Sequence, residues 1–176
     1  MSDTRSGTGP EGFAEFVRLR SGPLLRTAYL LCAGDRPAAE DLLQDVLERM
    51  YPRWRRISGS PEAYARAALA NTATNRWRRQ ARRVTETALI ADVTHTPMTG
   101  PHERVGEHDD LLAALAALAP GQRAAVVLRY FDDLTEADTA AAVNCRVGTV
   151  KSQTSRGLAR LRELLSRPNA HTGGAQ

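Results

Sequence analysis

The stretch Leu134–Leu165 constrains the fold most, because it contains two helical patterns separated by a turn. Thr135 precedes the first pattern and is followed three residues later by Asp138, an acidic variant of the capping box. Asn144 stands where the chain must turn, and Asn tolerates the left-handed backbone conformation that helix ends favour. After the turn, one buried helical face is predicted by a three-to-four-residue period. Its members are Val147, Val150, Thr154, Leu158, Leu161 and Leu165.

The spacing of small and β-branched residues predicts how these two helices cross. Ala140, Asn144 and Val150 allow a close, steep crossing, which is typical of a helix-turn-helix whose second helix enters a DNA major groove. The opposite face of the second helix is polar and basic, and these residues are the predicted DNA contacts: Thr149, Lys151, Ser152, Gln153, Ser155, Arg156 and Arg160. An ordinary helical hairpin with a solvated basic face is the alternative, which this stretch alone leaves open.

The composition favours an all-α protein, because Ala and Leu abound, aromatic residues are few and alternating β-branched runs are missing. The sequence has no run of 18 apolar residues and its N-terminus lacks a signal-peptide core. A cytoplasmic protein without membrane insertion is therefore expected. Cys32 and Cys145 lack CxxC spacing and the four His are irregularly spaced. Both cysteines are therefore expected to be reduced thiols. No metal site and no cofactor are expected.

The net charge of +4 conceals two basic blocks. Residues 51–83 carry nine basic groups and one acidic group, and residues 146–167 carry six and one. The segments between and before them are acidic overall. Two separated basic stripes predict two contacts with a polyanion. Arg provides 23 of the 24 basic side chains, which suits bidentate phosphate contacts. Genomic composition bias explains much of that preference, but it does not explain the clustering.

The periodicity divides the chain into two small helical domains joined by a flexible linker. The predicted segments are a disordered N-terminus at 1–11, a first domain at 12–83, a linker at 84–108, a second domain at 109–167 and a disordered tail at 168–176. In the first domain, Asp35 and Ser60 are predicted N-caps. Pro52 should kink or end a helix near Tyr51. The Ser21-Gly22-Pro23 sequence either kinks or splits the first helix.

Two adjacent helices of the first domain carry contrasting polar faces. The helix that follows Asp35 exposes an acidic face formed by Glu40, Asp41, Gln44, Asp45 and Glu48. This face is either solvated or a docking surface for a basic partner. The helix that follows Ser60 carries residues suited to single-stranded nucleic acid, since Asn binds base edges, Trp and Arg stack on bases, and Arg holds phosphates. They are Asn71, Asn75, Arg76, Trp77, Arg78, Arg79, Arg82 and Arg83. A solvated basic helix end explains only part of this cluster.

Three segments in this order resemble a known family: AEDLLQDVLERMY, ANTATNRWRRQARR and VGTVKSQTSRGLARLR. The chain resembles bacterial RNA polymerase sigma factors of the extracytoplasmic-function (group IV) type, in the sigma-70 family, and more narrowly an actinobacterial subgroup. The resemblance covers roughly residues 12–166. It implies a protein that directs core RNA polymerase to specific promoters and assists melting of the −10 element.

The resemblance also implies roles for individual residues. Asp41, Gln44, Asp45 and Glu48 would face the β′ clamp helices of core polymerase, and the second domain would bind the −35 duplex and the β flap. Asn71 and Asn75 would touch the non-template −10 strand, beside Trp77, while the loop 57–60 captures a flipped base. The adjacent DNA backbone would be held by Arg76, Arg78, Arg79 and Arg82. Whether an anti-sigma factor is a further partner stays open.

Two other classes of function are weaker. A free-standing helix-turn-helix regulator would explain Leu134–Leu165 but leaves Asn71–Arg83 without a role. An enzyme is not expected, because no Ser-His-Asp, Cys-His, Walker or paired-carboxylate pattern occurs in the sequence. The chain departs from the family at four positions: Arg146 replaces a capping Ser, Asn144 a turn Gly and Gly157 an Ala, and Pro52 is unexpected. These departures put local stability in doubt more than function.

Overall fold

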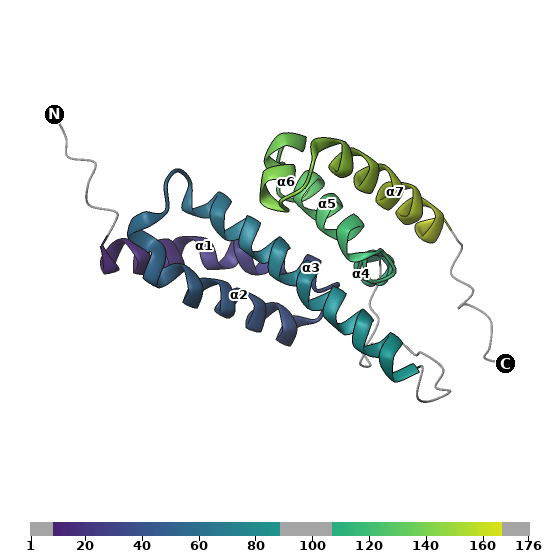
Figure 1. Ribbon diagram of the computed structural model, residues 1–176, viewed down its shortest axis with the longest axis horizontal. Helices are drawn as coiled ribbons and strands as arrows, with labels where there is room; N and C mark the ends of the chain where they lie inside the picture. Colours follow the sequence, from purple (N-terminus) through teal and green to yellow (C-terminus); the bar gives the residue numbers. More distant parts are fainter. Residues whose placement is uncertain (1–8, 89–106, 167–176) are drawn as a thin grey trace.

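The computed structural model describes residues 9–88 and 107–166, and in these ranges it contains helices and no strand (Figure 1). The predicted all-α class is confirmed. The first group of helices is α1 (Pro10–Leu31), α2 (Arg36–Met50), the 3-10 helix η1 (Tyr51–Arg56) and α3 (Pro61–Ala88). The second group is α4 (Glu107–Ala116), α5 (Pro120–Tyr130), α6 (Glu136–Ala142) and α7 (Val147–Leu165).

The first group is a bundle of α1, α2 and α3, and the predicted starts of α2 and α3 are confirmed. The carboxylate of Asp35 accepts a hydrogen bond from the Ala38 amide at 3.0 Å, and Ser60 Oγ accepts one from the Ala63 amide at 3.2 Å. Both side chains satisfy amides that lack a partner within the helix. The side of α2 opposite its predicted acidic face is buried, with Leu42, Val46 and Met50 at 0–1% exposure.

Two prolines shape this bundle differently. α1 runs unbroken through Pro23, so the predicted interruption does not split it, and Ser21 Oγ donates to the Val17 carbonyl at 2.6 Å. α2 ends at Met50, as Pro52 predicts, and the chain continues as η1. Phe13 of α1 packs edge-on against Tyr51 and Trp54 at ring distances of 5.2 and 5.3 Å. These aromatic contacts fix η1 against the start of α1.

The predicted segment boundaries need correction where helices extend beyond them. α3 continues to Ala88 and α4 begins at Glu107, so the linker predicted for 84–108 is helical at both ends. α1 begins at Pro10, inside the predicted disordered N-terminus. The flexibility predicted for the rest of the linker and for both chain ends concerns residues 1–8, 89–106 and 167–176, which lie outside the described residues.

The second group contains the predicted helix-turn-helix. Thr135 Oγ1 accepts from the Asp138 amide at 3.1 Å, and Asn144 has φ of +50° in the turn between α6 and α7. Ala140 and Val150 are buried where the two helices cross. The buried face of α7 is shorter than predicted, because Val147 and Leu165 are 39% and 48% exposed. These two residues lie at opposite ends of α7, where the neighbouring helices no longer cover it.

The two groups of helices pack directly against each other, with α5 and α6 lying along α3 (Figure 1). α4 meets the turn between α1 and α2, since a Cβ added at Gly34 would lie 2.9 Å from Leu112 Cδ1. Gly34 also has φ of +89°, a conformation that side chains disfavour. The sequence predicted two domains but did not predict this interface between them.

Candidate nucleic-acid interface

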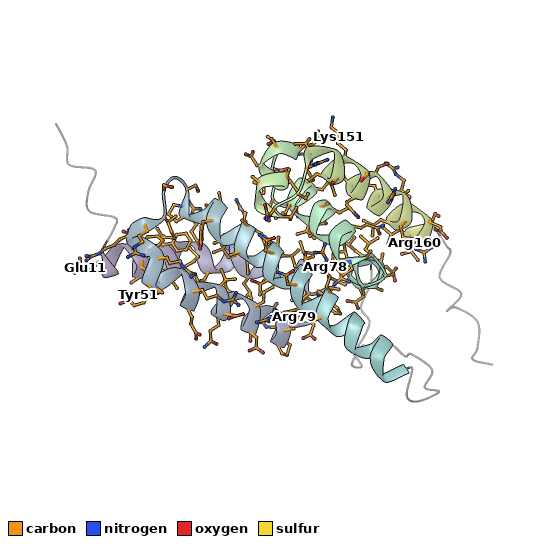
Figure 2. All side chains as sticks on the ribbon, viewed as in Figure 1. Glu11, Tyr51, Arg78, Arg79, Lys151 and Arg160 are labelled. Atoms are coloured by element: carbon orange, nitrogen blue, oxygen red, sulfur yellow. The ribbon has the colours of Figure 1, made fainter. Side chains whose placement is uncertain are left out.

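The outer face of α7 presents most of the predicted duplex contacts to solvent. Thr149, Lys151, Ser155, Arg156 and Arg160 are all exposed. Figure 2 shows Lys151 projecting from α7 on the side away from α3, with Arg160 near the other end of the helix. Lys151 lies 3.5 Å from the Glu136 carboxylate and Arg160 lies 2.7 Å from Glu163. Exposed ion pairs of this kind are weak, so both cations stay available to phosphates.

Two predicted duplex contacts are less free than the sequence suggested. Ser152 Oγ donates to the Thr149 carbonyl at 2.9 Å, within its own helix. Gln153 is half-buried, and its Cδ would lie 3.6 Å from a Cβ added at Gly121, at the start of α5. The prediction that Gln153 stands on the open face is therefore wrong in part. The helical period places residue 153 at the border between the two faces.

The start of α7 lacks a side-chain cap. Arg146 occupies the N-cap position with φ of −78° and ψ of 148°, and no side-chain cap hydrogen bond forms there. The sequence analysis had noted that Arg146 replaces a capping Ser, and the geometry agrees with a weaker cap at this position. The exposed amides at this end leave a partial positive charge beside the face that carries Thr149 and Lys151.

Only some residues of the predicted single-strand face of α3 are exposed to solvent, and others have protein partners. Asn75, Arg78 and Arg79 are exposed, and Figure 2 places Arg78 and Arg79 on the second half of α3. Asn71 is half-buried, because its side-chain amide donates a hydrogen bond to the Ala142 carbonyl at the end of α6. The expectation that Asn71 is open to solvent is wrong for this structure. The side chains of Arg82 and Arg83 lie outside the described residues.

Two more residues of the α3 face have protein partners. Arg76 pairs with Asp45 of α2 at 2.7 Å, so a residue predicted to bind DNA contacts one predicted to bind polymerase. Trp77 lies under the guanidinium of Arg123, whose Cζ is 4.9 Å from the ring centroid. The sequence analysis had assigned Trp77 to the predicted single-strand face. It could not identify Arg123, which comes from α5, as the partner.

Arg123 is a buried cation that the sequence analysis did not select. It is 3% exposed and donates to the carbonyls of Leu115, Ala116 and Leu118 at the end of α4, at 2.8–3.4 Å. It also donates to the Leu31 carbonyl of α1 at 3.1 Å. The negative ends of two helices therefore surround it. Burial lowers the pKa of Arg123 and raises the pKa of the neighbouring Cys32 thiol to about 11.

A cationic pocket of about 260 Å³ lies at the loop 57–60, where the resemblance implies capture of a flipped base. Its lining comprises Arg53, Arg56, Ile57, Ser58 and Tyr64. Sequence reasoning had named the loop but missed the two Arg of η1 and the Tyr of α3. The pairing of an aromatic ring with two guanidinium groups suits a base and its phosphates.

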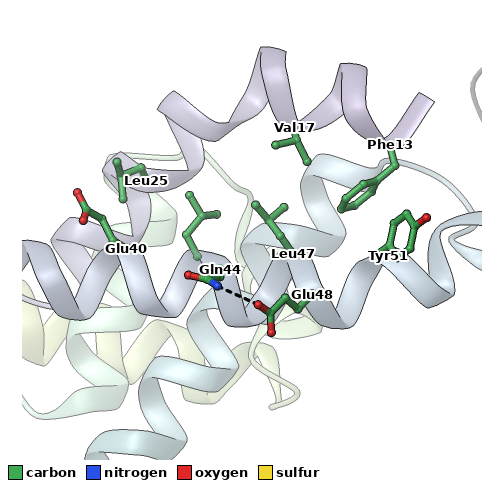
Figure 3. A pocket seen from close by; sticks show the side chains of 9 residues that line it. Phe13, Val17, Leu25, Glu40, Gln44, Leu47, Glu48 and Tyr51 are labelled. Carbon is green, nitrogen blue, oxygen red and sulfur yellow. Dashed lines mark hydrogen bonds between the residues drawn. The ribbon is translucent and has the colours of Figure 1, made fainter. Parts of the chain in front are cut away.

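A groove of about 530 Å³ lies on the surface between α1 and α2 (Figure 3). Its floor is apolar, with Phe13 and Tyr51 at one end and Leu25 at the other, and its α2 rim carries Glu40, Gln44 and Glu48. Gln44 donates to Glu48 at 2.9 Å.

The four predicted polymerase contacts differ in how accessible they are to a partner. Gln44 and Glu48 border the groove and Asp41 is exposed, whereas Asp45 is bound by Arg49 and Arg76. Burial alone would raise the pKa of Asp45, but the two Arg hydrogen bonds lower it below its ordinary value.

Neither a membrane-spanning helix nor a metal-binding cluster is found among residues 9–88 and 107–166. No helix in these ranges is long and apolar enough to cross a membrane. Within the same ranges, His, Cys, Asp and Glu form no cluster of three that could hold a metal ion.

Comparisons with known proteins match both groups of helices. Residues 16–83 match the family model for sigma-70 region 2, and residues 108–161 match the one for sigma-70 region 4. The RNA polymerase sigma-E factor of Streptomyces coelicolor is 41% identical over 155 residues, covering 87% of this chain and 85% of that protein. The ECF RNA polymerase sigma factor SigE of Mycolicibacterium smegmatis is 32% identical, covering 90% and 63% respectively.

A solved structure extends the match to the whole fold. The sigma factor RpoE of Bartonella quintana, crystallised with the anti-sigma factor NepR, superposes with a TM-score of 0.69 at 26% identity. The superposition covers 89% of this chain and 98% of that one. The chain thus belongs to the sigma-70 family of RNA polymerase sigma factors, within the extracytoplasmic-function group, and serves promoter-directed transcription initiation.

Proposed function

We propose that this sigma factor reads its promoter with two separate surfaces and binds core polymerase with a third. The observation that carries the proposal is the outer face of α7, whose polar side chains are exposed while Val150, Gly157 and Leu161 are buried on the other side. A helix oriented in this way presents a continuous row of donors to a major groove, where each base pair has a distinct pattern.

The −35 duplex would lie along this face of α7. Lys151 and Arg160 would hold phosphates, while Thr149, Ser155 and Arg156 would reach base edges. Ser152 and Gln153 would take part from the border of the face, with Gln153 lying beside Gly121. Each good bidentate contact to a base discriminates by about 1–3 kcal/mol.

The −10 element would be read as a single strand by α3 and η1. An unstacked base would enter the pocket of Arg53, Arg56 and Tyr64, since stacking and charge together stabilise a base outside the duplex. Asn75 would bind base edges, while Arg78, Arg79 and Arg82 would follow the backbone. Asn71, Arg76 and Trp77 would join this surface once released from their present partners. The proposed role requires binding energy alone and no covalent chemistry by the protein.

Core polymerase would bind at the groove between α1 and α2. An apolar floor beside Gln44, Glu48 and the exposed Asp41 fits an amphipathic helix that also carries basic residues. Asp45 would contribute after exchanging its Arg partners. The site of action would be the cytoplasm, where polymerase and chromosome are found. An anti-sigma factor is a proposed further partner, because the related RpoE was solved bound to NepR.

The test is transcription in vitro with purified core polymerase and a pool of genomic DNA, followed by sequencing of the RNA 5′ ends. We expect start sites that share a −10 and a −35 element and that vanish when this chain is omitted. Start sites identical with and without the chain would refute the proposal. A gel shift distinguishes a sigma factor from a free-standing helix-turn-helix regulator. The regulator would bind its operator specifically without polymerase, whereas the sigma factor would bind promoter DNA specifically only with core polymerase.

A further inference from the structure

The geometry of η1 brings two Arg side chains to the pocket at the loop 57–60. Arg53 and Arg56 are three residues apart, and side chains at this spacing lie one above the other along a 3-10 helix. Trp54 is buried and packs against α1, which turns the Arg side chains of η1 outward. Arg53 and Arg56 line the pocket, whereas Arg55 is exposed outside the lining.

No carboxylate neutralises Arg53 or Arg56 among the residues that the structure describes. Glu62 is the single acidic residue of the basic block 51–83. Its carboxylate binds Arg20 at 3.2 Å and Arg66 at 2.8 Å, so it is already occupied on α3. The positive charge at the pocket is therefore left for a ligand that carries acceptors.

The side chains that line the pocket are rich in hydrogen-bond donors. A guanidinium has five N–H donors and no acceptor, and the hydroxyls of Ser58 and Tyr64 can donate as well. The lining contains no Asn, Gln, Asp or Glu. Asn and Gln pair with adenine and Asp and Glu accept from the cytosine amino group, whereas Arg donates to O6 and N7 of guanine. Thymine presents the acceptor O4 in place of the cytosine amino group.

The size of the pocket and its aromatic ring fit a single base. The volume of about 260 Å³ is below the range of about 300–1,000 Å³ that is typical of pockets for drug-sized ligands. The ring of Tyr64 is 39% exposed and offers a surface for stacking. Stacking on an aromatic ring tolerates every base, so it retains a base without selecting it. Selection is left to the donors of Arg53 and Arg56.

We propose that this pocket selects an unstacked base with a keto oxygen, guanine or thymine, over adenine and cytosine, and that Arg53 and Arg56 determine the choice. This inference rests on the proposed function for the strand that supplies the base. One guanidinium reads the acceptors of the base and the other holds an adjacent phosphate. Base identity therefore depends on one Arg and affinity on both.

Transcription in vitro from a promoter library randomised across the −10 element tests the selection. We expect one position at which guanine and thymine exceed adenine and cytosine by at least about fivefold, the lower end of discrimination by one base contact. Arg53→Gln or Arg56→Gln should shift that position toward adenine, because Gln pairs with adenine N6 and N7. Preferences at the other −10 positions should persist in both variants.

Arg55→Gln is the matched control. It removes the same charge from the same short helix, at an exposed position outside the lining, and should leave the base profile unchanged. Tyr64→Leu should lower transcription for all four bases at the selected position, because it removes stacking and leaves the donors of Arg in place. Tyr64→Phe keeps the ring and should restore that activity.

A second measurement needs no polymerase. The full chain is titrated into four labelled oligonucleotides, each with one base flanked by abasic sites, and fluorescence anisotropy reports binding. We expect guanine and thymine to bind at least about fivefold more tightly than adenine and cytosine. The double variant Arg53→Ala with Arg56→Ala should bind all four equally, and Arg55→Gln should keep the order. Circular dichroism confirms that each variant is folded.

The outcomes separate the inference from the proposed function. Base profiles of Arg53→Gln and Arg56→Gln that match the unaltered protein would overturn the selection, and so would a preference for adenine or cytosine at the position that they alter. Both results would leave sigma activity intact. Absence of promoter-specific transcripts from the unaltered protein would count against the proposed function. The oligonucleotide titration would still decide the selection, since equal affinity of the unaltered chain for all four bases would overturn it.

Discussion

Gly157 of α7 faces Val126 of α5 so closely that a Cβ added at Gly157 would lie 2.8 Å from Val126 Cγ2 and 3.4 Å from the Gln122 carbonyl oxygen. The sequence alone marked this glycine as a local weakness inside a helix, worth up to about 1 kcal/mol against Ala. The structure reverses that interpretation. The missing side chain allows α7 to lie directly on α5.

Gly157→Ala should therefore destabilise the protein by about 1–3 kcal/mol, because overpacking at Val126 outweighs the gain in helix propensity. Thermal or urea unfolding measures the change. Gly148→Ala is the matched control, since nothing lies within 4 Å of an added Cβ at that position in the same helix. It should be neutral or stabilising by about 0.5–1 kcal/mol. Adding Val126→Ala to Gly157→Ala should restore part of the loss, and an unaltered midpoint for Gly157→Ala would contradict the packing argument.

Arg146→Ser should stabilise the start of α7 by about 0.5–2 kcal/mol, because a hydroxyl at the N-cap can accept from a first-turn amide. The backbone at Arg146 already has the extended conformation that a cap requires, and its own side chain makes no cap bond. Unfolding midpoints provide the measurement. Arg146→Ala removes the same charge without adding an acceptor, so a gain of equal size in that variant would show that capping is not the cause.

The Asp45–Arg76 pair should contribute stability that disappears in acid. The pKa of Asp45 is lower in the folded protein than its ordinary value of 3.8. A carboxyl of this kind stabilises the fold above its unfolded pKa and loses that contribution as the pH falls through the folded pKa. Because both side chains are partly exposed, a double-mutant cycle of Asp45→Asn and Arg76→Gln should give only about 0.2–1 kcal/mol at pH 7. Coupling of the same size well below pH 3.8 would contradict this origin.

Arg156→Ala should weaken discrimination at one position of the −35 element by about 1–3 kcal/mol if the guanidinium is bidentate to a base. Transcription from promoters substituted singly across the −35 element measures the effect. Arg162→Ala removes the same charge from an exposed position near the end of α7 and should lower activity on all promoters alike or not at all. Matching specificity profiles for Arg156→Ala and the unaltered protein would remove Arg156 from the base-reading set.

Features that depend on near neighbours were predictable from the sequence. The caps at Asp35, Ser60 and Thr135 each join residues three apart. The left-handed conformation of Asn144 follows from the tolerance of Asn for positive φ, and the buried side of α2 lies opposite the acidic face that the sequence predicted. Local steric preferences and amphipathic periodicity determine such elements before any tertiary contact forms. The order of three motifs was likewise sufficient to indicate the family.

Only the tertiary structure decided which polar residues stay open. Asn71 and Asn75 are the same residue type on one helix, yet Asn71 donates to Ala142 and Asn75 is exposed. Arg123 is held by carbonyls of α1 and α4, and nothing in its own neighbourhood of the sequence specifies the partner 92 residues away. The sequence by itself determined the helices, their caps and the chemistry of the two predicted DNA-binding faces. Packing between the domains determined which of those faces is free, because hydrogen bonds and burial between distant segments depend on three-dimensional proximity.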